Sequence, residues 1–323
     1  MKDINPEMTN KPSGKTVLVT GAAGLIGSAV VRLLTSQDIR VVACDDFSIG
    51  EWRSDDSLVT WEQVDITNPL LFDRFNTYAI NAVVHCAAHP GGRSLSEPVE
   101  DVKVNAFGSM QIFEWCARNS IPVVYLSSSA VYGRQPHGLI REDALLDPGT
   151  IYAVCKVACE NFLRILGEGY GLKWTVLRLF ATYGSGHKPS TFQGIVNVML
   201  TQLLSGNKVV VRGSLNRERD LVYVDDAASA IVKSLFNHNA RGHIINIGTG
   251  TPVSILSLIE TLSRVLGRQF TDIEIIEEAG TVGDPFSNVA DCTKSRNILG
   301  FIPRYDLERG LTELIKQRTY QKN

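Results

Sequence analysis

The sequence predicts an α/β protein built on a Rossmann-type, doubly wound parallel sheet, with a smaller, interleaved α/β substrate-binding domain. Three observations support this prediction. Short β-branched runs alternate with longer amphipathic stretches, as in parallel strands joined by helices. The first run leads directly into a glycine-rich turn, "TGAAGLIG". The alternation loosens after residue 185, which indicates a second and smaller unit.

The first half of the chain supplies the elements of the large sheet. Each predicted strand is a short run rich in apolar and β-branched residues, typical of parallel strands buried on both faces. These strands are predicted at 15–20, 39–45, 81–87, 122–128 and 173–180. Helices are predicted between and after them at 25–36, 69–78, 98–119 and 151–168, and the third begins at Pro98, where a missing N–H costs nothing.

A dinucleotide site is predicted where the first strand turns into the first helix. Glycines at 21, 24 and 27 let the backbone turn sharply and approach a pyrophosphate; a tightly packed turn without a ligand is the alternative. Asp45 ends the second strand, where its carboxylate can bind ribose hydroxyls and would repel a 2′-phosphate, so the cofactor is predicted to be NAD rather than NADP. We expect the NAD site to comprise Gly21, Gly24, Leu25, Ile26, Gly27, Asp45, Asp46, Asp65, Ile66, Ala87 and Ala88, with Asp65 and Ile66 near the adenine.

The second half of the chain is predicted to hold the smaller unit. We expect a helix near 192–205 and a strand at 208–213, and "DLVYVDD" and "HIINIG" are candidates for strands that return to the first sheet. The predicted division is a flexible tail (1–13), an NAD-binding domain (14–184 and 220–252) and a substrate-binding domain (185–219 and 253–320).

Composition excludes several classes of partner. The chain has 323 residues, 44% of them hydrophobic, and a net charge of -2 with scattered basic residues, so we expect no nucleic-acid partner. No segment approaches the roughly 18 apolar residues of a membrane span, and the N-terminus has no apolar signal segment, so we expect no membrane association. The six cysteines and six histidines form no paired or metal-binding motif, which predicts free thiols, a cytoplasmic location and no metal.

A chemical site is predicted beside the NAD site. The hydroxyls of "SSSAVYG" (127–133) follow a predicted strand, and ligands of such sheets bind at the carboxyl ends of the strands. Tyr152 and Lys156 are one helical turn apart, although this spacing alone is also common on a solvated helix face. A tyrosine base must ionise far below its usual range of about pH 10, and a nearby ammonium favours the phenolate. We therefore predict Tyr152 as the acid/base, Lys156 as its charged neighbour and a ligand of the nicotinamide ribose, and a serine hydroxyl beside them.

These motifs, in this order, resemble the extended short-chain dehydrogenase/reductases, specifically the NAD-dependent nucleotide-sugar epimerase/dehydratase branch and its UDP-glucose 4-epimerase-like members. The likeness extends from "TGAAGLIG" through "SSSAVYG", "YAVCK" and "RDLVYVDD" to "GDPFSNVADCTKSRNILGF". It implies that Ser128, rather than Ser127 or Ser129, is the active-site hydroxyl. It also places Asn105 among the residues near the cofactor and Arg219 at the substrate diphosphate. The predicted substrate contacts are Ser128, Ser129, Arg219, Arg212 and His89, although His89 also reads as an ordinary loop residue.

The resemblance also selects among reactions. Dehydratases of the family follow the active-site hydroxyl with Asp-Glu, whereas this chain has Ser129 and Ala130, so a reversible oxidation at one carbon is expected. The prediction is an NAD-dependent nucleotide-sugar 4-epimerase that recycles bound NAD. The alternatives are a dehydrogenase or 4-ketosugar reductase that exchanges its cofactor, and a catalytically idle NAD-binding protein.

Two positions depart from the pattern of the family, and both concern the substrate phosphates. Ala181 stands where epimerases usually have Asn, and Thr281 where they usually have a second phosphate-binding arginine. Lys188, Arg212 and Arg217 are candidates to compensate, or are simply exposed surface charges.

The resemblance further implies a homodimer formed through the helices near 98–119 and 151–168. Apolar residues on the first of these are compatible with such an interface, although core packing explains them equally well; they are Phe107, Met110, Ile112 and Phe113.

Overall fold

The computed structural model describes residues 14–186, 194–280 and 284–320. Its centre is a seven-stranded sheet with the order β10-β6-β5-β4-β1-β2-β3, and every neighbouring pair is parallel. The strands are β1 (Thr16–Thr20), β2 (Arg40–Asp45), β3 (Val59–Gln63), β4 (Ala82–His85), β5 (Val123–Ser128), β6 (Trp174–Leu179) and β10 (His243–Ile247). The predicted doubly wound sheet is confirmed. Because the strand order reverses between β1 and β4, a binding crevice is expected at their carboxyl ends.

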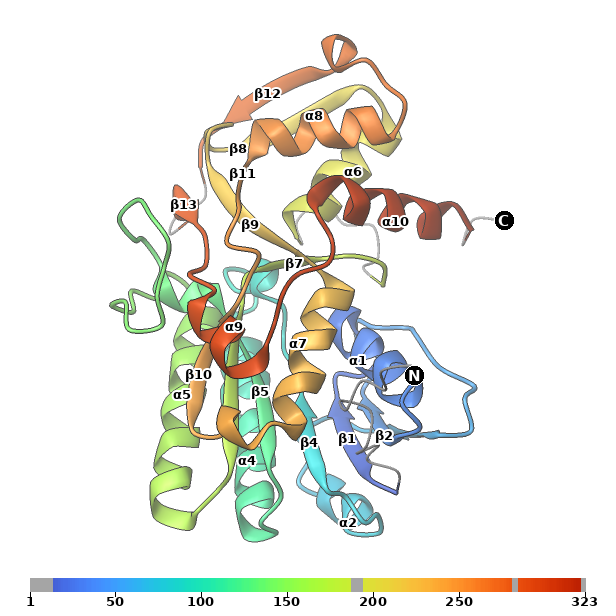
Figure 1. The fold of residues 1–323 in the computed structure, drawn as a ribbon, viewed down its shortest axis with the longest axis vertical. Helices are drawn as coiled ribbons and strands as arrows, with labels where there is room; N and C mark the ends of the chain where they lie inside the picture. Colours follow the sequence, from blue (N-terminus) through green and yellow to red (C-terminus); the bar gives the residue numbers. More distant parts are fainter. Residues whose placement is uncertain (1–13, 187–193, 281–283, 321–323) are drawn as a thin grey trace, which may run out of the picture.

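Helices cover both faces of this sheet (Figure 1). Alternate strand residues point to opposite faces, so Val17 and Val19 join the core beneath α1 and α7, whereas Leu18 joins the core beneath α4 and α5. Both sets of strand side chains are fully buried, which explains the continuous apolar runs in the sequence. The helices are α1 (Leu25–Thr35), α2 (Leu71–Phe75), α4 (Ser109–Arg118), α5 (Ile151–Tyr170) and α7 (Val224–Phe236).

The helix predicted at 98–119 is not uniform. It begins as one turn, α3 (Pro98–Glu100), continues as a π-helical segment, η3 (Asp101–Gly108), and becomes α-helical only in α4. The predicted helix is therefore confirmed, but its first half is not uniformly α-helical. Wide helical turns of this kind often mark functional positions.

The smaller unit lies at the carboxyl ends of the central strands (Figure 1). One of its sheets contains β7 (Ala181–Tyr183), β9 (Glu218–Tyr223), β11 (Pro252–Ser254) and β13 (Ser287–Asn288), and the other pairs β8 (Lys208–Arg212) with β12 (Glu274–Glu278). Its helices are α6 (Ile195–Ser205), α8 (Ile255–Val265) and α10 (Leu307–Tyr320), while α9 (Thr293–Leu299) packs against β10. Short 3₁₀ helices lie at Gly91–Arg93 (η2), Ser129–Tyr132 (η4), His238–Ala240 (η5) and Phe270–Asp272 (η6).

Of the two strands suggested to return to the first sheet, only one does so. β10, from "HIINIG", pairs with β6, as predicted. β9, from "DLVYVDD", belongs instead to the smaller unit. The reason lies in Asp220, which is fully buried and accepts hydrogen bonds from the N–H groups of Thr249, Gly250 and Ala290, so that it ties β9 to neighbouring loops. The other boundaries of the two domains remain our proposal.

No helix in the described ranges is long and apolar enough to cross a membrane.

Candidate active site

One cleft of about 1030 Å³ collects most of the predicted site residues. It opens at the carboxyl ends of β1, β2, β4 and β5, where the strand order reverses. The predicted residues that line it are Gly21, Gly24, Leu25, Ile26, Gly27, Asp45, Asp46, Asp65, Ile66, Ala87, Ala88, His89, Ser128, Ser129, Tyr152 and Lys156. Asn105, Arg212 and Arg219 are not among its lining residues.

The glycine-rich turn gives this cleft a floor made of backbone. Gly21 has a φ of +66°, and a Cβ added to it would lie 2.6 Å from the backbone nitrogen of Ala87, so only glycine fits there. Helix α1 then starts after Gly24 without a side-chain cap, which leaves the N–H groups of its first turn to a ligand. A close backbone approach beside such a helix start fits the pyrophosphate of a dinucleotide.

Asp45 lies at the side of this floor. Its carboxylate accepts hydrogen bonds from the N–H of Ala23 at 2.9 Å and the N–H of Phe47 at 2.8 Å. Burial raises the pKa of Asp45, and these two hydrogen bonds oppose the rise. Asp46 and Asp65 each accept a hydrogen bond from the N–H two residues further on, so both hold local turns. These three carboxylates form an acidic edge of the cleft, and hydrogen bonds within the chain hold each of them in place.

Tyr152 and Lys156 point into the cleft from the first turns of α5. The Lys156 side chain is only 3% exposed, and its Nζ donates to the carbonyl oxygen of Leu126 at 2.8 Å. The same ammonium lies 5.5 Å from the centre of the Tyr152 ring. The α5 N-terminus is capped by Thr150, which accepts the N–H of Ala153, so the first turn that carries Tyr152 is well defined. The cleft thus holds a buried ammonium beside the tyrosine ring.

The three serines after β5 have different surroundings. Ser127 donates to Glu160 Oε1 at 2.6 Å, and the Glu160 carboxylate is held by Arg178 in a buried ion pair. Ser128 accepts the N–H of Ala130 at 3.2 Å, which leaves its own proton available for donation. Ser127 therefore takes part in the core network, whereas the Ser128 hydroxyl can still act in the cleft.

His89 and Asn105 form one buried cluster beside the cleft. The Asn105 side chain accepts the N–H of His89 at 2.8 Å and donates to the carbonyl oxygen of His89 at 3.0 Å. The His89 ring lies between two carboxylates, with Nδ1 2.9 Å from Asp101 Oδ1 and Nε2 2.9 Å from Glu97 Oε2. His89 is 8% exposed, so it is not an ordinary solvated loop residue. Asn105 is placed behind this loop.

The predicted phosphate-binding residues are spread over the smaller unit. Arg217 and Arg219 both bind the Asp284 carboxylate, and both are largely buried, so Arg217 is not the exposed charge considered above. Burial, with the charge of Arg217, lowers the pKa of Arg219 to about 10. Arg212 is a surface residue with a 70% exposed side chain, 3.9 Å from Glu278.

Of the positions that concern the phosphates, Ala181 lines the cleft. Thr281 and Lys188 lie outside the described residues.

Several cleft residues had no signal in the sequence. Arg93, Glu97 and Glu100 line the cleft beside His89, and Trp52 lines it near the acidic edge. They belong to no recognisable motif, and only the folded loop brings them together. His85, in "VVHCAA", was also missed. Its ring bridges Thr20 and Ser109 between β1 and η3–α4, and burial, assisted by Lys156, lowers its pKa to about 3, so it is neutral.

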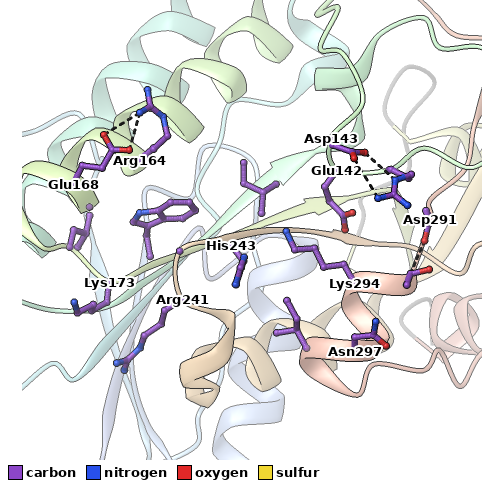
Figure 2. A pocket seen from close by; sticks show the side chains of 18 residues that line it. Glu142, Asp143, Arg164, Glu168, Lys173, Arg241, His243, Asp291, Lys294 and Asn297 are labelled. Carbon is purple, nitrogen blue, oxygen red and sulfur yellow. Dashed lines mark hydrogen bonds and ion pairs between the residues drawn. The ribbon is translucent and has the colours of Figure 1, made fainter.

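A second hollow, of about 1100 Å³, lies along β10 and contains none of the predicted site residues (Figure 2). Its charged side chains come from the loop at 141–143, the end of α5 and the residue before β6, the loop before β10, and the residues at 291 and 294, and Arg164 pairs there with Glu168. The described residues contain no group of three His, Cys, Asp or Glu side chains that could hold a metal ion.

Known proteins resemble this chain in both sequence and structure. The sequence profile described as "NAD dependent epimerase/dehydratase family" matches residues 17–248. A UDP-glucose 4-epimerase of Azospirillum brasilense is 31% identical over 319 residues, which cover 91% of this chain and 89% of the relative. The solved structure of a Thermotoga maritima UDP-glucose 4-epimerase with UDP-glucose has a TM-score of 0.89 and 28% identity, covering 95% of this chain and 100% of that one. A Bacillus cereus UDP-glucuronic acid 4-epimerase in complex with UDP-glucuronic acid and NAD has a TM-score of 0.86 and 27% identity, with 95% and 99% covered. This chain belongs to the NAD dependent epimerase/dehydratase family.

Proposed function

We propose that this protein is an NAD-dependent nucleotide-sugar 4-epimerase. The observation that carries the proposal is the convergence of Ser128, Tyr152 and Lys156 on the same cleft as the glycine-rich turn and Asp45. A hydride acceptor and an acid/base can meet in such a cleft, and a sugar alcohol requires both for its oxidation.

The NAD-binding role rests on the floor and sides of the cleft. Gly21, Gly24 and the N-terminus of α1 would hold the pyrophosphate, because no side chain obstructs the backbone there. The carboxylate of Asp45 would bind the adenosine ribose and disfavour a 2′-phosphate. When bound, NAD supplies the hydride acceptor and donor of the reaction.

The acid/base role is assigned to Tyr152. Its phenolate would take the proton of the sugar 4-hydroxyl as the C4 hydrogen leaves as hydride, and would return a proton when the ketone is reduced on its other face. The buried ammonium of Lys156 would stabilise that phenolate and hold the nicotinamide ribose. Ser128 would donate a hydrogen bond to the reacting oxygen, since its proton is not used by the neighbouring backbone.

A nucleotide diphosphate sugar is proposed as the substrate class. Arg217 and Arg219 share one carboxylate, so together they retain a positive charge that suits a diphosphate. Structural neighbours are named for UDP-glucose and for UDP-glucuronic acid, so the class of substrate is better supported than its sugar. Arg212 and Ser129 are weaker candidates for further contacts.

The proposal is tested by purifying the protein and measuring its bound NAD and its turnover. A panel of UDP-, GDP-, CDP- and dTDP-sugars is incubated with the protein without added cofactor, and NMR reports the configuration at C4 over time. Conversion without added NAD supports the epimerase. A requirement for exchange of NAD with solvent would favour the dehydrogenase or ketosugar reductase, and a protein that binds NAD without converting any sugar would favour the idle alternative.

We further propose a homodimer formed through α3, η3, α4 and α5, which pack against one another. Of these, α4 and α5 lie side by side in Figure 1. Ile112 and Phe113 cannot contribute, because both are fully buried in the core of the same chain. Other apolar side chains on these helices are exposed, among them Val99, Phe107 and Val154. Light scattering of Phe107→Glu should give a monomer, whereas Ile302→Glu, at an exposed apolar residue elsewhere, should remain dimeric; a monomeric wild-type protein would contradict the proposal.

All six cysteines are free thiols, and a cytoplasmic location remains part of the proposal.

A further inference from the structure

We propose that His89 is a positioning residue for Tyr152, and that it acts by fixing the loop from His89 to Ser94 against the Tyr152 ring. The inference rests on the proposed function, because it concerns the residue assigned as acid/base there. It is carried by a cluster of three buried side chains, His89, Asp101 and Asn105, with the half-exposed Glu97, and by the contacts of this loop with α5.

His89 is held at four points. Its backbone N–H and C=O both bind the Asn105 side chain, and its two ring nitrogens face Asp101 and Glu97 at 2.9 Å each. Asp101 is fully buried, and its Oδ1 also accepts a hydrogen bond from Asn105 at 3.0 Å. Asp101 and Asn105 belong to the π-helical segment η3, so this unusual helix presents both side chains to one loop residue.

The His89 ring is held from two opposite sides. Each of its nitrogens lies at hydrogen-bond distance from a carboxylate oxygen, one of Asp101 and one of Glu97. Arg93 lies 4.0 Å from Glu97, and Glu100 and Lys103 form an ion pair on the next turn. Glutamine at position 89 has a single amide group and could not present two ring nitrogens to opposite sides.

The loop transmits this arrangement to Tyr152 through two contacts. A Cβ added to Gly91 would lie 3.1 Å from the Tyr152 ring, so the Gly91 backbone already lies close to that ring. Ser94 is 2% exposed, and its Oγ accepts the N–H of Tyr152 at 3.0 Å. The Tyr152 ring is therefore close to both this loop and the Lys156 ammonium. If the loop moves, the hydroxyl of Tyr152 moves relative to the cleft.

The first part of the test observes the ring directly. The protein is labelled with 3-fluorotyrosine, and the ¹⁹F resonance of Tyr152 is assigned by its loss in Tyr152→Phe. In His89→Gln, this resonance should shift and broaden. His243→Gln, the same substitution at an exposed histidine, should leave it unchanged. An unchanged Tyr152 resonance in folded His89→Gln would overturn the inference, whether or not the protein epimerises any sugar tested.

The second part measures turnover with a substrate that the wild-type protein converts. A misplaced acid/base lowers kcat, so His89→Gln should reduce kcat by about tenfold to a hundredfold while KM and bound NAD stay unchanged. Gly91→Ala should give a similar loss, because its methyl group pushes on the same ring. The double variant should be little worse than either single variant, since both act through one contact. An increase in KM with unchanged kcat would show that His89 contacts the substrate instead, and fully additive losses would show two separate effects; either result overturns the inference.

Glu97→Gln keeps the test decisive if His89→Gln does not fold. This variant changes only the half-exposed partner of the ring and should cause the same change in the Tyr152 resonance to a smaller extent. A Glu97→Gln protein with a wild-type resonance and wild-type kcat would count against the inference. Wild-type protein that converts no sugar would refute the proposed function alone, because the resonance of Tyr152 still reports its position.

Discussion

Replacing Tyr152 with phenylalanine should abolish turnover and leave the fold and the NAD content intact. The contacts of Tyr152 include its N–H bond to Ser94 and its ring contacts with Gly91 and Lys156. None of these uses the hydroxyl, and phenylalanine keeps all of them. We therefore expect the free energy of unfolding to change by less than about 0.5 kcal/mol, as for a substitution outside the core.

The same substitution removes the hydroxyl to which we assign the acid/base role. Loss of a positioned acid/base typically costs about 10²- to 10⁴-fold in rate, equivalent to about 3 to 5 kcal/mol of transition-state stabilisation. The assay is the NMR measurement of C4 epimerisation, with thermal unfolding and bound NAD measured on the same sample. Tyr170→Phe is the matched control, because Tyr170 is exposed at the end of α5, far along the helix from the cleft. Activity of Tyr152→Phe within threefold of wild type would refute the assignment.

Other substitutions probe the cofactor, the core and the substrate phosphates. Asp45→Ala should weaken NAD binding by about tenfold, since it removes a charged hydrogen-bond partner, and titration calorimetry should detect this; unchanged affinity would place the ribose elsewhere. Burial lowers the pKa of His85 to about 3 in the folded protein, below its ordinary value of 6.5. As the pH falls, the unfolded chain therefore takes up a proton at His85 before the folded protein does. The wild-type protein should therefore lose up to about 5 kcal/mol of its free energy of unfolding between about pH 6.5 and 3. In denaturant unfolding, His85→Gln should show a shallower pH dependence of this free energy than the exposed-site control His243→Gln. Arg219→Ala should raise KM for the nucleotide sugar about tenfold with little change in kcat; the reverse pattern would place Arg219 in the chemical step.

The residues whose place in the cleft could be predicted from the sequence are those set by local geometry, and their roles remain our proposal. The close approach at Gly21 and the end of β2 at Asp45 each depend on a strand and the turn that follows it. Tyr152 and Lys156 share a face because α5 is an uninterrupted helix of 20 residues. Parallel strands buried on both faces also leave an apolar run that is visible in the sequence.

The features that could not be predicted depend on contacts between distant segments. β9 carries the same kind of apolar run as the central strands, but the bonds of Asp220 to residues near 249 and 290 place it in another sheet. The π-helical segment η3 has no recognisable repeat in the sequence. It begins at Asp101, whose buried side chain bonds to His89 in a distant loop, and that contact exists only in the folded chain. The burial of Arg217 likewise follows from its pairing with Asp284, far along the chain.

The central claim is that one bound cofactor removes hydride from C4 and returns it to the same sugar. It is tested most directly by incubating the protein with a convertible nucleotide sugar that carries deuterium at C4, in ordinary water and without added NAD. We predict that the epimerised product retains its deuterium at C4, as measured by NMR and mass spectrometry. Loss of deuterium from C4 during epimerisation would contradict transient oxidation at this carbon.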